Sequence, residues 1–172
     1  MQENKPVLIV GLGNPGNEYA HTRHNVGFMA VEYLAGDGAR WKNEFSAQTF
    51  ATDIDGRRVI FVKPQTYMND SGRAVRAIMD FYKIPIENLI VIHDDMDLKI
   101  GDMRTKIGGG SAGHNGIKSI DATVGNEYMR IRIGIDHPRN LKLPIDAADW
   151  VLGRFTSEQL SIIQDVIKQI LI

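Results

Sequence analysis

The sequence predicts an α/β fold: a single three-layer domain over residues 1–172, in which helices flank a mixed, largely parallel, twisted sheet. Two observations carry this prediction. Apolar runs with the length and β-branched content of buried strands alternate with stretches of helical period along most of the chain. One hairpin signal, Asp55-Gly56, interrupts the alternation and makes the sheet mixed. A length of 172 residues also fits one domain that can bury a core.

The first predicted unit is a buried strand over 7–10, followed by a glycine-rich turn and a helix that ends near Gly36 or Gly38. Thr22 is expected to cap this helix, which would put His24 in the first helical turn. The positive end of the helix dipole would then disfavour a charged imidazole at His24.

A hairpin and a second helix come next. Strands are predicted over 48–54 and 58–63, with the hairpin turn between them and Pro64 after them. An apolar stripe of helical period follows and predicts the helix. Its cap is expected to be one of three adjacent polar residues, Asn69, Asp70 or Ser71.

The middle of the chain reads as two strands, a loop and a helix. A buried strand over 89–92 is expected to end in the polar segment 93–97. Residues 102–107 alternate as a strand does, and 108–116 form a flexible glycine-rich loop. The helix after this loop is expected to close at Gly125.

The last third predicts one strand and one helix with clear signals. Strict alternation over 129–135 predicts a strand. Residues 147–152 form a short element whose type the pattern leaves open. Thr156 and Gln159 have the spacing of a capping box, so a helix begins there and is expected to run to Ile172.

The composition predicts a soluble, cytoplasmic protein. Hydrophobic residues make up 43% and charged residues 24% of the chain, which is ordinary for a globular protein. No apolar run approaches the length needed to span a bilayer, and the N-terminus lacks the pattern of a secretory signal. The absence of cysteine excludes disulfides and thiolate metal sites.

The net charge of −1 does not by itself indicate a nucleic-acid-binding protein. The segment 99–142 nevertheless holds eight basic residues against four acidic ones. The basic residues are Lys99, Arg104, Lys106, Lys118, Arg130, Arg132, Arg139 and Lys142. This local excess fits either a phosphate-binding face or ordinary solvated surface, and charge alone favours the second.

Gly11, Gly13 and Gly16 form a G-x-G-x-x-G pattern, which raises the question of dinucleotide binding. In that fingerprint the helix opens at the third glycine, and an acidic residue ends a second strand about 20 positions later. Here Pro15 stiffens the turn, the helical period begins later, and Glu32 lies within the helix. The glycines therefore favour a catalytic loop, in which we expect Asn14 and His24 to face each other across a cleft.

Polar loops follow three predicted strands, at 13–25, 64–69 and 93–97, and ligands bind at the carboxyl ends of strands in such sheets. The loops, with the glycine-rich segment, offer Asn14, His24, Asn69, His93, Asp94, Asp95, Asp97, His114 and Asn115. Their spacing does not indicate a metal site, a nucleophile elbow or a P-loop. What remains is a histidine–aspartate pair that activates water, with asparagine amides to hold a carbonyl.

His24 is the better candidate for the base, and Asp94, just beyond a buried strand, suits the role of its partner. A carboxylate at one ring nitrogen fixes the tautomer and stabilises the charge that appears when the other nitrogen takes a proton. The alternative for His24 is a surface histidine on a helix, and for Asp94 a turn or capping carboxylate.

Six linked motifs resemble bacterial peptidyl-tRNA hydrolase over residues 7 to about 155, in unbroken order. They are Val10-Gly11-Leu12-Gly13-Asn14-Pro15-Gly16 with Tyr19, Thr22-Arg23-His24-Asn25, Lys63-Pro64-Gln65-Thr66-Tyr67-Met68-Asn69, His93-Asp94-Asp95-Met96-Asp97-Leu98, Gly113-His114-Asn115-Gly116 and Arg130-Ile131-Arg132-Ile133-Gly134-Ile135. Six motifs at matching intervals are far more specific than any one of them.

The resemblance implies an enzyme that hydrolyses the ester between a peptide and the 3′-terminal ribose of tRNA. It implies that His24 is the general base, that Asp94 orients it and that Asn14 holds the reacting centre. The other implied contacts are Asn69 and Asn115 with the peptide main chain and the tRNA end, Tyr19, Met68 and His114 along the cleft, and Lys106 and Arg132 with tRNA phosphates. It also implies a monomer that needs no metal and no organic cofactor.

The sequence departs from the family pattern in two places. Ser111-Ala112 replaces the Gly/His-rich residues often found before Gly113, which alters the loop but removes no catalytic group. The chain ends at Ile172, before the usual family length, so the C-terminal helix is expected to be short.

A non-catalytic reading competes with the enzyme reading, because a plant organelle splicing factor resembles this family and binds a partner protein instead. Retention of Asn14, His24, Asp94 and Asn69 together argues for the enzyme. A nucleotide-dependent oxidoreductase is the third reading, and the context of the glycines argues against it.

Overall fold

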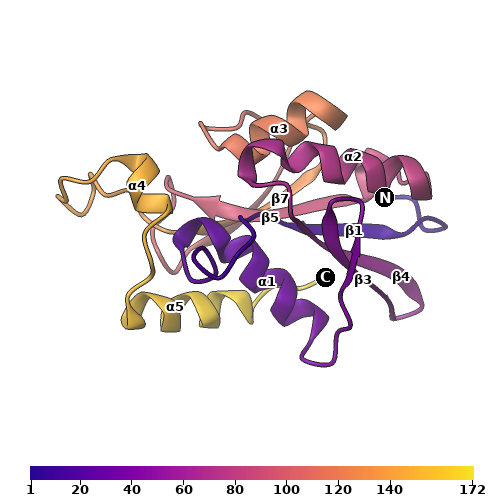
Figure 1. The fold of residues 1–172 in the computed structure, drawn as a ribbon, viewed down its shortest axis with the longest axis horizontal. Coiled ribbons are helices and arrows are strands. Elements are labelled where there is room, and N and C mark those ends of the chain that lie inside the picture. The colour runs from indigo at the N-terminus through magenta and orange to yellow at the C-terminus, as the bar shows by residue number, and fades with distance from the viewer.

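The computed structural model describes residues 1–172 and shows one sheet between two layers of helices (Figure 1). The strands are β1 (Val7–Gly11), β2 (Lys42–Glu44), β3 (Ala47–Ile54), β4 (Arg57–Pro64), β5 (Leu89–Asp95), β6 (Met103–Ile107) and β7 (Met129–Gly134). The α-helices are α1 (Val26–Ala35), α2 (Ser71–Tyr82), α3 (Asn115–Val124), α4 (Ala147–Val151) and α5 (Ser157–Ile167). None of the helices is long and apolar enough to cross a membrane.

The seven strands lie in the order β2-β3-β4-β1-β5-β7-β6. The four central strands, β4, β1, β5 and β7, run parallel to one another. Antiparallel pairs lie at both edges, with β2 and β3 on one side and β6 on the other. The predicted α/β fold with a mixed sheet is therefore confirmed, and the carboxyl ends of β1, β4 and β5 meet at one edge of the sheet.

Alternate residues of the central strands supply two cores, one on each face of the sheet. Ile9 of β1 packs beneath α1 and α5, while Leu8 and Val10 pack beneath α2 and α3. Figure 1 shows these two helix pairs on opposite faces of the sheet, with α4 projecting to one side. Because β1 is buried on both faces, it reads as a continuous apolar run rather than an alternating one.

The prediction that His24 lies in the first turn of α1 is wrong. Residues Arg23–Asn25 form a separate 3-10 turn, and α1 begins at Val26. Thr22 does not cap a helix, because its hydroxyl donates to the carbonyl of Tyr19, 2.8 Å away. His24 is consequently held by a tight turn at the carboxyl ends of the strands, and this turn precedes α1.

Two other boundaries near the site differ from the sequence prediction. The strand β5 continues to Asp95, so Asp94 lies in a buried strand and not in a loop. The expected side-chain cap of α2 is absent, because Ser71 donates its hydroxyl back to the carbonyl of Met68 at 2.8 Å and neither Asn69 nor Asp70 caps the helix.

Toward the C-terminus, the element left open in the sequence is the short helix α4. The capping box of Thr156 and Gln159 is present and opens α5 as predicted. That helix ends at Ile167 and does not run to Ile172 as expected. The short strand β2 carried no recognisable signal, because it has three mostly exposed polar residues.

The opening glycines serve close packing of α1 against the sheet. A Cβ atom on Gly27 would lie 2.4 Å from both the amide nitrogen of Leu12 and the carbonyl oxygen of Ile92. A Cβ atom on Gly11 would lie 2.1 Å from the carbonyl oxygen of Gly27. The two backbones therefore cross at a distance that only glycine allows. The G-x-G pattern is explained here by packing.

Gly27→Ala is expected to destabilise the fold, because a methyl group there overlaps backbone atoms that cannot move without displacing β1 or β5. Overpacking of this kind costs about 1–3 kcal/mol. Gly38→Ala is the matched control, because nothing lies within 4 Å of a Cβ atom at that position. Urea unfolding of both variants measures the difference, and equal stabilities would contradict the packing account.

Candidate active site

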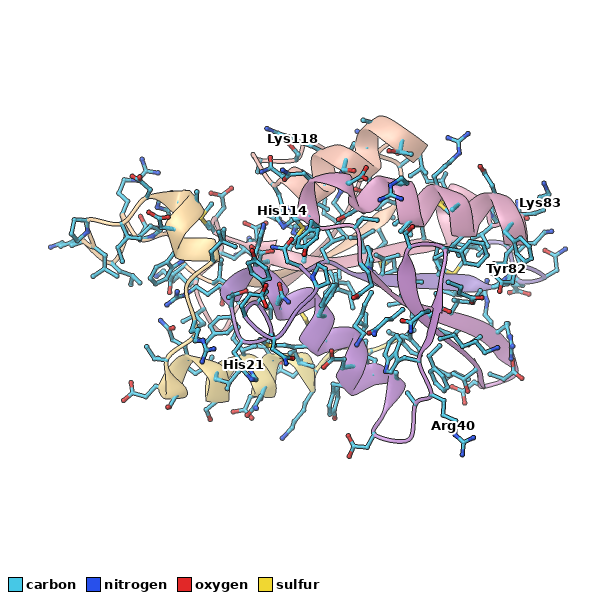
Figure 2. All side chains as sticks on the ribbon, viewed as in Figure 1. His21, Arg40, Tyr82, Lys83, His114 and Lys118 are labelled. Atoms are coloured by element: carbon cyan, nitrogen blue, oxygen red, sulfur yellow. The ribbon has the colours of Figure 1, made fainter.

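Three side chains from distant parts of the chain meet at the carboxyl end of the sheet. The Nδ1 atom of His24 lies 2.8 Å from Oδ2 of Asp94. The Nε2 atom of His114 lies 2.8 Å from Oδ1 of the same carboxylate. His114, labelled in Figure 2, stands immediately before α3. The predicted contact between His24 and Asp94 is confirmed, and His114 adds a second donor.

The hydrogen bonds around Asp94 assign the tautomers of His114 and His24. Its Nδ1 atom accepts from the backbone amides of Gly116 and Ile117, at 3.1 and 3.3 Å, and so caps α3. A nitrogen that accepts carries no proton, so Nε2 of His114 is the donor to Asp94. An ionised carboxylate only accepts, so Nδ1 of His24 also donates. The lone pair of His24 is therefore on Nε2.

The electrostatics of this trio keep Asp94 ionised. Burial alone would raise the pKa of Asp94, but the charges and hydrogen bonds of His24 and His114 lower it well below its usual range. Burial tends to lower the pKa of His24, and the charge and hydrogen bond of Asp94 outweigh this effect, so the pKa is raised. The expectation that a helix dipole would disfavour the imidazolium is wrong, because the carboxylate dominates.

His93 lies beside this trio and stays neutral. Its Nδ1 atom donates to the backbone carbonyl of Asp94 at 2.8 Å, and its buried Nε2 atom has no partner. The ring of His93 packs edge-on against that of His114, with centroids 5.0 Å apart. Burial, with the charge of His114 as a second cause, lowers the pKa of His93 to about 4.

A cavity of about 200 Å³ opens beside His24. Its walls come from the end of β5, the glycine-rich loop, the start of α3 and one side of α4. The lining residues include His24, Asp94, Asp95, Met96, Asp97, His114, Asn115, Ala147, Ala148 and Val151. The histidine–aspartate pair thus borders an open cavity at the carboxyl end of the sheet.

Asn14 is fixed by hydrogen bonds at the edge of the same region. Its Oδ1 atom accepts from the amide of Met68 at 2.7 Å, which leaves the side-chain NH₂ group as a free donor. The side chain of Asn25 exchanges two 2.9 Å hydrogen bonds with the backbone of Asn14. Asn14 lines a second cavity of about 320 Å³, and not the cavity beside His24. The expectation that Asn14 and His24 face each other across a cleft stays a prediction.

Comparisons with known proteins agree on one family. Residues 8–172 match the family described as peptidyl-tRNA hydrolase. A peptidyl-tRNA hydrolase of Rickettsia bellii (strain RML369-C) is 47% identical over 167 residues, which cover 95% of this chain and 89% of the relative. The chain belongs to the peptidyl-tRNA hydrolase family. The relative from Aliarcobacter butzleri is 47% identical over 161 residues, covering 94% and 86%.

A solved structure of the family supports the same fold. The crystal structure of peptidyl-tRNA hydrolase from Acinetobacter baumannii superposes with a TM-score of 0.89 at 41% sequence identity. The match covers 98% of this chain and 85% of that chain.

Four further residues were implied by the family resemblance, Tyr19, Met68, Asn69 and Asn115, and only Asn115 lines one of the two cavities. Met68 is buried, and Asn115 lines the cavity beside His24. The ring of Tyr19 lies edge-on to that of Tyr67, with centroids 6.5 Å apart. Asn69 is exposed in the 3-10 turn before α2 and lines neither cavity. Their roles in substrate binding stay predictions.

The two basic residues of the resemblance lie on the antiparallel pair β6 and β7. Lys106 is exposed on β6. Arg132 on β7 donates Nε to Oδ2 of Asp95, 2.8 Å away, and is partly exposed. Arg104 lies directly opposite Arg132 in the sheet register. Arg104 belongs to the basic excess over 99–142, and its position two residues before Lys106 in an alternating strand is the sequence signal that marks it as a further candidate.

Asn25 is the clearest residue that the sequence argument missed. It is 1% exposed, and both polar atoms of its side chain hold the backbone of Asn14. Its only sequence signal is its position next to His24.

The ligand atoms of His24, Asp94 and His114 lie within 4.8 Å of one another, which is close enough for a metal site. The residue spacing gave no sign of this cluster, because its members are brought together by the fold. A metal on Nε2 of His114 would place the proton on Nδ1 and break the cap of α3. The hydrogen bonds of His114 therefore favour a proton on Nε2, donated to Asp94, over a metal ion at that atom.

Lowering the pH from 6.5 to 4 is expected to destabilise the protein, because the unfolded chain takes up a proton at His93 that the folded one excludes. The loss is about 3 kcal/mol for a pKa near 4. In this window the stabilising contribution of His24, whose folded pKa is raised, is nearly complete. The contribution of Asp94, whose folded pKa is lowered, begins to fall only at the acid end of the window.

His93→Asn keeps a donor for the carbonyl of Asp94 and should flatten this slope in urea unfolding measured from pH 4 to 6.5. Ile78, on the buried face of α2, provides the control: Ile78→Val should lower the free energy of unfolding but keep its dependence on pH. A slope that survives in His93→Asn would assign the acid sensitivity to another group.

Proposed function

We propose that this chain hydrolyses the ester between a peptide and the 3′-terminal ribose of tRNA, with His24 as the general base that activates water. One arrangement carries the proposal: His24 lines a cavity, and its Nδ1 atom lies 2.8 Å from the carboxylate of Asp94, which leaves the lone pair of the neutral ring on Nε2. An activated ester needs little more than an aligned water molecule, a base and a few hydrogen-bond donors.

The proton movements follow from these hydrogen bonds. His24 takes a proton from water at Nε2 while the water oxygen attacks the ester carbonyl carbon. Asp94 stabilises the imidazolium that forms, because its carboxylate already accepts from Nδ1. When the tetrahedral intermediate breaks down, the imidazolium returns the proton to the departing 3′ oxygen of the ribose. The products are a peptide, whose new carboxylic acid releases the second proton of the water to solvent, and a tRNA with a free hydroxyl group.

His114 is not suited to be the base, although it contacts the same carboxylate. Its only lone pair, on Nδ1, is used by the amides of Gly116 and Ile117. Its role in this mechanism is to hold Asp94 by a second hydrogen bond. If Nδ1 of His114 took up a proton, the amides of Gly116 and Ile117 at the start of α3 would lose their acceptor.

Asn14 presents the NH₂ group that the mechanism needs for a substrate carbonyl or the oxyanion. Because the amide of Met68 occupies Oδ1, Asn14 cannot turn that oxygen toward the substrate. His24 lines the cavity of about 200 Å³, and Asn14 lines the cavity of about 320 Å³. In peptidyl-tRNA a peptide and a nucleotide extend in different directions from one ester bond. We propose that these two parts of the substrate occupy the two cavities. Asn69, Asn115, Tyr19 and Met68 are proposed as further contacts.

We propose that Lys106 and Arg132 bind phosphates of the tRNA backbone. Asp95 binds only the Nε atom of Arg132, and the partly exposed side chain keeps its terminal NH₂ groups for a phosphate. A contact that is partly neutralised by a carboxylate is weak, which suits an enzyme that must release tRNA after each turnover. The monomeric state, the cytoplasmic location and independence of metals and organic cofactors stay predictions.

His24→Ala is expected to lower kcat about 10²–10⁴-fold, because the water loses its base. Release of a labelled peptide from peptidyl-tRNA under single-turnover conditions measures the loss, and an unchanged Tm shows that the fold is intact. Ile78→Val serves as the folded control. Turnover near that of the wild type would reassign the base to another group, and a wild type that releases no peptide would favour the non-catalytic reading.

Arg132→Ala is expected to raise KM and to reduce the slope of log affinity against log salt by about one, as for one lost phosphate contact. Arg58→Ala is the control, because Arg58 is an exposed arginine at the amino end of β4, whereas the candidate site lies at the carboxyl ends of the strands. Asp95→Asn separates the ion pair from the phosphate contact, since it leaves Arg132 in place. If Arg132→Ala leaves the salt slope unchanged, Arg132 is only the structural partner of Asp95.

A further inference from the structure

Arg23, the residue before His24, carries a buried charge without a carboxylate partner. It is 6% exposed, forms no ion pair, and its Nε atom has no hydrogen-bond partner. Burial lowers the pKa of this guanidinium. A buried charge without a counter-ion is costly, so the contacts that compensate for it identify what the residue does.

The first of these contacts is with α4. The guanidinium carbon of Arg23 lies 3.5 Å from the ring centre of Trp150, which is a close cation–π stack. Its Nη1 atom also donates to the backbone carbonyl of Trp150 at 3.2 Å. Trp150 is fixed in turn, because its indole nitrogen donates to the carbonyl of Asp136 at 2.9 Å.

The second contact reaches the start of α5. The Nη2 atom of Arg23 donates to Oε1 of Gln159 at 3.1 Å, and that oxygen also accepts from the amide of Thr156 in the capping box. The backbone amide of Arg23 donates to the carbonyl of Gly153 at 2.9 Å. The backbone carbonyl of His21, a residue labelled in Figure 2, accepts from the amide of Phe155 just before α5. One arginine therefore joins the turn of His24 to both C-terminal helices.

The helix α4 depends on such contacts. It has only five residues, and a helix of that length is not stable by itself. The segment before it carries exposed apolar side chains at Leu141, Leu143 and Ile145 and so adds little buried surface. Yet α4 supplies one wall of the cavity beside His24, through Ala147, Ala148 and Val151.

We propose that Arg23 is a positioning residue that holds α4 against the turn carrying His24, and so fixes the distance between the cavity wall and the catalytic base. This inference rests on the proposed function, because it takes the cavity to be the substrate cleft. Arg23 lines neither cavity, and its side chain donates to Trp150 and Gln159 rather than to His24 or Asp94. Its loss loosens the wall that the substrate packs against and leaves the base intact.

Arg23→Lys tests this directly, because lysine keeps the charge but cannot stack as a plane or reach two acceptors at once. KM for peptidyl-tRNA is expected to rise about tenfold, with kcat within about twofold of the wild type. The pH profile of kcat/KM should be unchanged. Trp150→Leu removes the stack from the other side and should raise KM similarly. Trp150→Phe, which keeps an aromatic face, should recover most of the affinity.

Ile78→Val is the control for a general loss of stability, because it lies in the opposite core and should lower Tm without changing KM. Two results would overturn the proposal. A KM unchanged in Arg23→Lys and in Trp150→Leu, with only Tm lowered, would make the stack a purely structural feature. A fall in kcat with a shifted pH profile would show that Arg23 acts on His24 rather than on α4.

The Trp150 variants keep the test decisive if Arg23→Lys does not fold. The wild type, measured in the same assay, separates this inference from the proposed function. If the wild type releases peptide and the variants keep their KM, only the role of Arg23 fails.

Discussion

The structure of the site depends on one buried carboxylate with two imidazole donors. Asp94 is 2% exposed, and each of its oxygens accepts from a different histidine. A buried aspartate without such donors would take up a proton, because burial disfavours the charged form. The two hydrogen bonds keep it ionised and so orient His24. The tautomer of His24, the position of its lone pair and the cap of α3 all follow from this arrangement.

The sheet provides the frame for that carboxylate. Asp94 lies within β5, where backbone hydrogen bonds to β7 fix its position, and does not depend on a mobile loop. Close packing at Gly11 and Gly27 brings the start of α1 onto the adjoining strands. The 3-10 turn just before α1 then reaches the end of β5. The pair of His24 and Asp94 is therefore positioned by close contacts between backbones, and the neighbouring cavities are formed by more exposed segments.

Local chemistry made much of the fold predictable. The Asp55-Gly56 turn has a positive φ at both residues, which the sequence indicates by residue type alone. The pairing of His24 with Asp94 was predictable because each follows or ends a strand at the same edge of the sheet. The stack of Arg23 on Trp150 was not, because 127 residues separate the two and neither leaves a local pattern. The same holds for the cap that His114 places on α3, since histidine is not a preferred capping residue.

The double duty of His114 narrows the replacements that this position tolerates. A substitute must accept from the amides of α3 with one atom and donate to Asp94 with another, across the width of an imidazole ring. Alanine offers neither atom, lysine only donates, and a glutamate would oppose the charge of Asp94. Asparagine has both kinds of atom but a shorter reach. Residue 114 is therefore restricted by the cap of α3 and by the hydrogen bond to Asp94 at once, so a defect there cannot be repaired by restoring either contact alone.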